Sequence, residues 1–166
     1  ICDKLDIDLV GVPKSSVSTI PSRYKKAKKI GLAMSPDMEI VSSLNPDWIL
    51  CPSSLQTDLE PKFKELKNTE YAYLNLKSVQ GMYRSMQELG EIFGKEEQAE
   101  KQTNEFIIFY KNYTKRNKNK KHPKVLVLMG LPGSYVIATE NSYVGSLVKL
   151  AGGENVYQNT DQEFLT

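Results

Sequence analysis

The chain has 166 residues, of which 40% are apolar, so it is long enough to bury a core, and it contains no apolar run long enough to cross a membrane. Its 22 basic and 20 acidic residues give a net charge of +2, which excludes a chain-wide field of the kind that binds nucleic acid. Basic residues cluster between Lys111 and Lys124, and we interpret this cluster as a solvated helix end. Cys2 and Cys51 are too few for a disulfide framework or a zinc site, and we expect free thiols.

The first third of the chain predicts a strand, a long loop and a helix. Residues 1–6 resemble the end of a helix, and Leu9–Val12 forms a short strand that Pro13 closes. A polar loop is expected over 14–29. Ser35 is the expected N-cap of the next helix, with Pro36 as its first residue and Met38, Val41 and Leu44 facing inward.

The next segments alternate strands and helices at short spacing. In order they are a strand at Trp48–Cys51, a helix at 54–66, a strand at 71–76 and a helix from Ser78 to Phe93 with apolar positions at Val79, Met82, Met86 and Leu89. Such alternation predicts an α/β fold with a parallel sheet covered by helices.

A stretch without Gly or Pro, residues 95–121, predicts one helix about 40 Å long, suited to bridging two lobes. Pro123 ends it, and a second unit follows. The expected elements are a buried strand at Lys124–Met129, a strand at 134–139 and a helix at 143–151 that Ser142 caps and Gly152-Gly153 terminates.

The sequence contains few residues or motifs suited to catalysis. The only histidine, His122, lies between Lys121 and Pro123, where we expect a solvated hinge residue rather than a general base. No nucleophile-elbow, metalloprotease or P-loop motif occurs, so an α/β enzyme is a minor alternative.

Met34 is the most distinctive candidate for a ligand-binding residue. It precedes the expected N-cap Ser35, outside the apolar face of the helix, where open α/β sheets meet their ligands. Most methionines fill gaps in cores, but a thioether is also an axial ligand of haem iron.

Four segments, 30–39, 45–47, 122–135 and 147–156, resemble the IsdE-type family of haem-binding lipoproteins. Ala151 to Val156 (AGGENV) is shared with the wider siderophore and cobalamin binding-protein class, whereas Met129 to Tyr135 (MGLPGSY) points to the haem branch. The resemblance implies a bilobal class III solute-binding fold, with parallel-sheet lobes at 1–94 and 122–166 joined by the helix at 95–121.

In that family a methionine from the first lobe and a histidine from the second hold the haem iron (iron protoporphyrin IX). The methionine matches Met34, whereas the histidine segment is expected beyond Thr166, and His122 does not match it. Both ends of the chain fall in mid-pattern, so we expect a fragment that lacks the first strand and part of the second lobe. Further cleft residues are expected at strand ends and helix starts: Pro13, Ser53, Ser54, Ser134 and Tyr135.

The resemblance implies an extracytoplasmic receptor, not an enzyme, that takes haem from cell-surface donor proteins and delivers it to an ABC permease for iron uptake. Contact with the membrane is expected only through a lipid anchor upstream of Ile1, and no nucleic-acid partner is expected. The alternative is a binding protein of the same fold for a ferric siderophore or cobalamin, in which Met34 merely packs.

Overall fold

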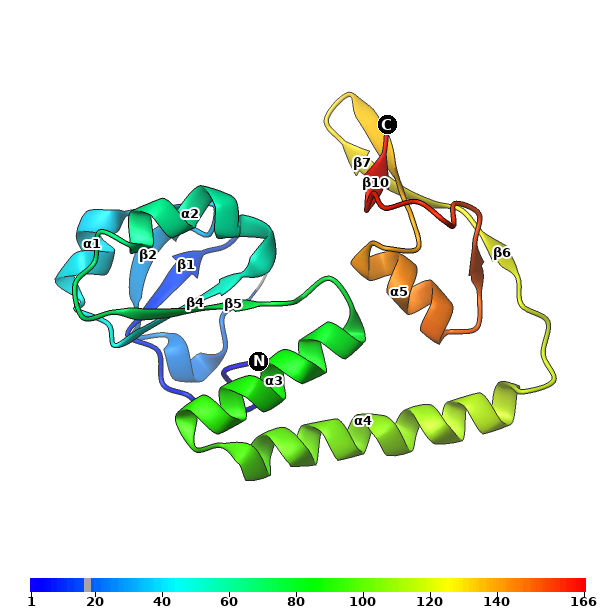
Figure 1. Cartoon of the computed structure of the whole chain (residues 1–166), viewed down its shortest axis with the longest axis horizontal. Coiled ribbons are helices and arrows are strands. Elements are labelled where there is room, and N and C mark those ends of the chain that lie inside the picture. The colour runs from blue at the N-terminus through cyan, green and yellow to red at the C-terminus, as the bar shows by residue number, and fades with distance from the viewer. Residues whose placement is uncertain (17–18) are drawn as a thin grey trace. The chain divides into compact units, whose positions relative to one another are not determined.

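The computed structural model describes residues 1–16 and 19–166, which divide into two compact units (Figure 1). Unit 1 contains Ile1–Leu74 and Met86–Ala99, and unit 2 contains Asn75–Ser85 and Glu100–Thr166. The boundaries fall inside two helices, so each of these helices contributes residues to both units. The lobe limits expected from the sequence, 1–94 and 122–166, remain a prediction.

Unit 1 contains two hydrogen-bonded ladders of strands. One is formed by β1 (Gly11–Lys14), β2 (Lys28–Leu32) and β3 (Ser35–Pro36), and the other by β4 (Trp48–Pro52) and β5 (Glu70–Leu74). The pairs β1–β2 and β4–β5 are parallel, which confirms the expected strand direction. β3 returns antiparallel to β2. The first strand is displaced by two residues from the expected Leu9–Val12, and Pro13 lies inside it.

The short helices of unit 1 are η1 (Ser22–Tyr24), α1 (Met38–Ser43), η2 (Ser53–Leu55) and α2 (Gln56–Phe63). Leu59 and Phe63 lie one turn apart on α2 and pack with Cys51 of β4 in a buried cluster, which Met38 and Tyr73 border. The helix expected over 54–66 is therefore shorter and begins with a 3₁₀ turn, because Ser53–Leu55 adopts that tighter form.

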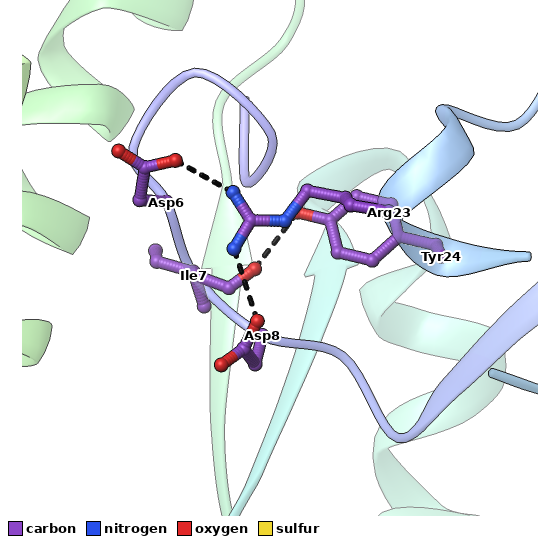
Figure 2. Close-up of polar contacts among 5 residues, drawn as sticks. All are labelled: Asp6, Ile7, Asp8, Arg23 and Tyr24. Atoms are coloured by element: carbon purple, nitrogen blue, oxygen red, sulfur yellow. Dashed lines mark hydrogen bonds and ion pairs between the residues drawn. The ribbon is translucent and has the colours of Figure 1, made fainter. Parts of the chain in front are cut away.

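The start of the chain forms hydrogen-bonded turns rather than the expected helix end. Arg23 and Tyr24 of η1 hold these turns in place. The Tyr24 hydroxyl donates to the Ile7 carbonyl oxygen at 2.8 Å, and the Arg23 guanidinium contacts Asp6 at 2.7 Å and Asp8 at 3.0 Å (Figure 2). Tyr24 is buried, so it anchors these turns to η1 by packing as well. Cys2 and Cys51 are both free, as expected.

Two long helices follow β5. α3 (Val79–Phe93) buries Val79, Met86 and Leu89, which confirms the apolar face expected from their helical spacing. α4 (Glu96–Asn117) runs unbroken through Phe106 for 22 residues, or about 33 Å. The single long helix is therefore confirmed, with its C-terminal end four residues earlier than expected.

Unit 2 adds β6 (Lys124–Val125), β7 (Val127–Leu131), β8 (Ser134–Ala138), α5 (Tyr143–Leu150), β9 (Glu154–Asn155) and β10 (Phe164–Leu165). β6 and β9 are parallel, but β7 and β8 form an antiparallel hairpin, to which β10 adds a further antiparallel strand. The expectation of parallel pairing therefore does not extend to this hairpin.

The strand expected at Lys124–Met129 was wrong in two respects. It is interrupted at Leu126, and it is not buried, since Leu128 and Met129 are 54% and 41% exposed. The helix signals were better: Ser142 caps α5 by accepting a hydrogen bond from the Gly145 amide at 2.9 Å, and Gly152 has the left-handed φ of +85° typical of a helix C-terminus.

Candidate ligand-binding site

Met34 lies in the two-residue turn at the tip of the β2–β3 hairpin. Leu32 pairs with Ser35 and Gly31 with Pro36, which leaves Ala33 and Met34 as the connecting residues. The Met34 side chain is 73% exposed. Its thioether is therefore not a core gap-filler and is accessible to a ligand.

The base of this hairpin requires a glycine. Gly31 has a φ of +89°, and a Cβ added there would lie 3.0 Å from the Asp37 amide nitrogen and 3.1 Å from the Ser35 carbonyl oxygen. Close approach of the two strands lets the Asp37 amide donate to the Ile30 carbonyl oxygen at 2.8 Å. The hairpin is thus closed at its base, and the position of Met34 relative to β2 is restrained.

Asp37, not Ser35, is the N-cap of α1. Its carboxylate Oδ1 accepts hydrogen bonds from the amides of Glu39 and Ile40, both at 3.1 Å. The predicted cap was wrong because Ser35 and Pro36 are engaged in pairing with β2, which moves the helix start to Met38. A short strand therefore separates Met34 from the helix, and the hairpin is fixed both at β2 and at α1.

The tip of the hairpin exposes three consecutive apolar residues, Leu32, Ala33 and Met34, and Leu32 is 61% exposed. Exposed apolar runs are uncommon on protein surfaces unless they bind something. Leu32 was not among the candidates from sequence. The available signal was its place between Gly31 and the Ser35-Pro36 pair, which indicates a turn rather than a core segment.

Pro13 lies at the same end of the β1–β2 ladder as the hairpin. Lys14 pairs with Leu32, and the register shifts between Val12 and Lys14, at Pro13 itself. A proline is tolerated there because β1 is an edge strand and the irregularity removes the need for an amide donor. Register thus brings Pro13 near the strand end that carries Met34.

Strand pairing does not connect the remaining candidate residues with Met34. Ser53 is half-buried and Ser54 exposed at the start of η2, directly after β4, which belongs to the other ladder of unit 1. Ser134 and Tyr135 belong to unit 2, where they begin β8 after the turn at Gly133 and are both exposed. Strand and helix ends therefore do carry these residues, as expected, but pairing does not place them beside Met34.

His122 is exposed and engaged in a local contact. Its Nδ1 lies 2.7 Å from the Gly152 carbonyl oxygen, and because a carbonyl only accepts, Nδ1 is the donor. This bond joins the loop after α4 to the end of α5, which accounts for His122 without a ligand role.

Two ionisable groups at the core cluster of unit 1 have raised pKa values. Burial raises the pKa of the Cys51 thiol, and burial also raises the pKa of the Tyr73 hydroxyl, which has no hydrogen-bond partner among the described residues.

Within residues 1–16 and 19–166, no group of three or more His, Cys, Asp or Glu side chains is arranged to hold a metal ion.

Comparison with known proteins defines the class. The family of periplasmic binding proteins matches residues 1–166, and the chain belongs to this family. It is 43% identical over 166 residues to IsdE of Staphylococcus aureus strain Newman, a high-affinity heme uptake system protein. That match covers 99% of this chain and 56% of the relative, so the chain spans little more than half the length of the curated relatives it matches.

Two solved structures resemble the chain closely. An ABC transporter substrate-binding protein from Listeria monocytogenes EGD-e matches with a TM-score of 0.90 and 40% identity, over 99% of this chain and 63% of that one. S. aureus IsdE complexed with heme matches with a TM-score of 0.89 and 40% identity, over 99% and 64%. The class III binding-protein fold expected from the sequence is thereby confirmed.

Proposed function

We propose that the chain is part of an extracytoplasmic receptor that binds haem and delivers it to an ABC permease for iron uptake, with Met34 as an axial ligand of the haem iron. The observation that carries this proposal is the exposed thioether at the tip of a hairpin restrained by Gly31 and Asp37. The similarity to a heme uptake protein supports the choice of ligand. The proposed activity is binding and delivery, not catalysis.

The residues at the hairpin tip fit haem in two ways. A thioether sulfur is an established axial donor to haem iron, and the exposed Leu32 and Ala33 offer apolar surface to a porphyrin. We expect the second axial ligand to be a histidine outside residues 1–166, since His122 is bonded to Gly152. Cell-surface haem donors, the permease and an upstream lipid anchor belong to the same proposal; no helix that the structure describes is long and apolar enough to span a bilayer.

A pair of methionine substitutions tests the ligand assignment. Met34→Ala in the full-length protein should weaken haemin binding at least about ten-fold and alter the Soret and visible bands, because one axial bond is lost. Met38→Ala should leave the bands unchanged and lower the free energy of unfolding by about 1–3 kcal/mol, because Met38 is half-buried against the Cys51 cluster. Haemin titration followed by absorption, with urea unfolding of each variant, gives both quantities.

Other results of these haemin titrations would change the assignment of the ligand. An unchanged spectrum in Met34→Ala would remove Met34 from the iron, and an altered spectrum in Met38→Ala would assign the ligand there instead. If the full-length protein, with the histidine expected outside residues 1–166, gives no Soret shift with haemin, the ferric siderophore or cobalamin alternative replaces haem.

A further inference from the structure

The sequence places a dense cluster of basic residues on the C-terminal half of α4 and on the loop that joins it to β6. Figure 1 shows the course of this helix and loop. The members, here called the α4 basic segment, are Lys111, Lys115, Arg116, Lys118, Lys120, Lys121 and Lys124. All seven are exposed. They contribute seven positive charges to a chain whose net charge is +2, so the rest of the chain is net negative.

Strand pairing places one acidic residue, Glu154, beside this segment, as the partner of Lys124 in the β6–β9 pair. The sequence contains no Asp or Glu between Glu105 and Glu140, and none of the seven side chains takes part in an ion pair within the described ranges. Lys115 and Arg116 lie in the last turn of α4, where the helix dipole favours a cation. That effect ends with the helix at Asn117, so it gives no reason for the lysines that follow.

The segment is displayed on a fixed backbone rather than on a loose tail. The Tyr113 hydroxyl donates to the Ala151 carbonyl oxygen at 2.8 Å, and His122 donates to the Gly152 carbonyl oxygen at 2.7 Å. These two bonds attach α4 and the loop after it to the end of α5, within unit 2. A depression on α4 is lined by Asn112, Lys115 and Arg116. Like charges held this close repel each other, and a polyanionic surface would relieve that repulsion.

Apolar side chains accompany the charges. Ile108 and Phe109 are 62% and 58% exposed directly before Lys111, and the Phe109 ring stacks on Tyr113 at 6.1 Å between centroids. Exposed aromatic and aliphatic groups beside lysines are typical of surfaces that lie on the headgroup layer of a membrane. Six of the seven basic residues are lysines, which act as point charges on phosphates rather than as bidentate readers of a defined site.

We propose that the α4 basic segment docks unit 2 on an anionic phospholipid surface. The choice of a membrane over a nucleic acid rests on the proposed function, which places the protein outside the cytoplasm beside a membrane permease. The interaction requires no bound haem, because none of the seven side chains belongs to the Met34 hairpin. Such docking would hold the receptor close to the membrane and limit the orientations in which it meets the permease.

Vesicle co-sedimentation tests the proposal. The chain should bind vesicles of equal parts phosphatidylglycerol and phosphatidylcholine, should not bind vesicles of phosphatidylcholine alone, and should be released by 0.5 M salt, about three times physiological ionic strength. Each lysine near such a surface contributes roughly five-fold in affinity, so the triple variant K115Q/K118Q/K121Q should lose on the order of 100-fold.

The matched control is the triple variant K25Q/K26Q/K28Q, which removes the same charge from three exposed lysines of unit 1. It should keep vesicle binding within about three-fold, and circular dichroism should show both triple variants folded. Equal loss in the two triple variants would overturn the proposal in favour of a net-charge effect. Binding to phosphatidylcholine alone, or to duplex DNA more tightly than to the anionic vesicles, would also overturn it.

Haemin titration separates this proposal from the proposed function. In the full-length protein, K115Q/K118Q/K121Q should bind haemin as the unaltered protein does, and Met34→Ala should bind anionic vesicles as the unaltered protein does. If the unaltered full-length protein binds anionic vesicles but not haemin, the haem receptor alone is overturned, and if it binds haemin but not the vesicles, the docking surface alone is overturned.

Discussion

Tyr24 shows how one side chain holds the start of the chain in place. Its ring is 4% exposed, its hydroxyl donates to the Ile7 carbonyl oxygen, and the Arg23 guanidinium lies 5.4 Å from its ring centroid (Figure 2). Burial raises the pKa of Tyr24 to about 12, because the phenolate would lose its solvation. The folded state therefore favours the protonated tyrosine more strongly than the unfolded state does.

This pKa difference predicts an alkaline loss of stability. The unfolded phenol titrates near pH 10, so the contribution of Tyr24 is complete below pH 10 and is lost as the pH rises from about 10 to about 12. Tyr24→Phe should cost about 1 kcal/mol at pH 8, because the hydrogen bond to Ile7 is removed. That deficit should shrink or reverse at pH 11. Urea unfolding at both pH values measures it, and a constant difference between the two proteins would contradict the assignment.

The elements with the best sequence signals are those whose stability is local. α3 shows apolar residues at helical spacing, and α4 is a long stretch without Gly or Pro, so both were placed within four residues of their ends. β2 and β3 were missed, because Lys28 and Lys29 look like loop residues and the two strands exist through pairing with distant β1 and with each other. The break at Leu126 likewise follows from β6 pairing with β9 and β7 with β8.

In the candidate site, too, some features follow from local sequence and others depend on strand pairing. Met34 could be proposed from its place before a helix and from a family resemblance, but its true setting depends on strand pairing. Three residues in succession, Ser35, Pro36 and Asp37, all suit a helix start, and local propensity does not choose between them. Pairing of the first two with β2 leaves Asp37 as the cap, and it also creates the exposed tip that includes Leu32.

The position of the cap gives a direct test of the β2–β3–α1 arrangement. Asp37→Ala should lower the free energy of unfolding by about 1 kcal/mol, because two amides of the first turn of α1 lose their acceptor. Ser35→Ala, the matched control, should cost less than about 0.5 kcal/mol, since Ser35 is exposed and pairs through its backbone. Chemical denaturation of the two variants decides the matter. A larger cost for Ser35→Ala would restore the serine as the cap.

At the scale of the whole molecule, unit 1 and unit 2 differ in the interactions that stabilise each of them internally. Unit 1 contains most of the buried apolar residues that the structure describes, including Leu5, Leu59 and Leu89 at 2% exposure or less. The most deeply buried residues of unit 2 include the polar Thr139 and Ser142, and the Ser142 hydroxyl donates to the Thr139 carbonyl oxygen at 2.7 Å. Hydrogen bonds of this kind add about 1 kcal/mol each, whereas a fully buried leucine contributes about 2 kcal/mol.

Unit 2 should therefore open more readily than unit 1. Its hairpin strand β7 has Leu128 more than half exposed, so opening β7 uncovers little additional apolar surface. β4 carries Cys51, which packs with Leu59 and Phe63, and opening β4 would expose that cluster. Hydrogen–deuterium exchange of the 166-residue chain, read by mass spectrometry on peptides covering Trp48–Pro52 and Val127–Leu131, should show slower exchange in the first. If β7 were protected as strongly as β4, the polar contacts of unit 2 would have to contribute as much stability as the apolar core of unit 1.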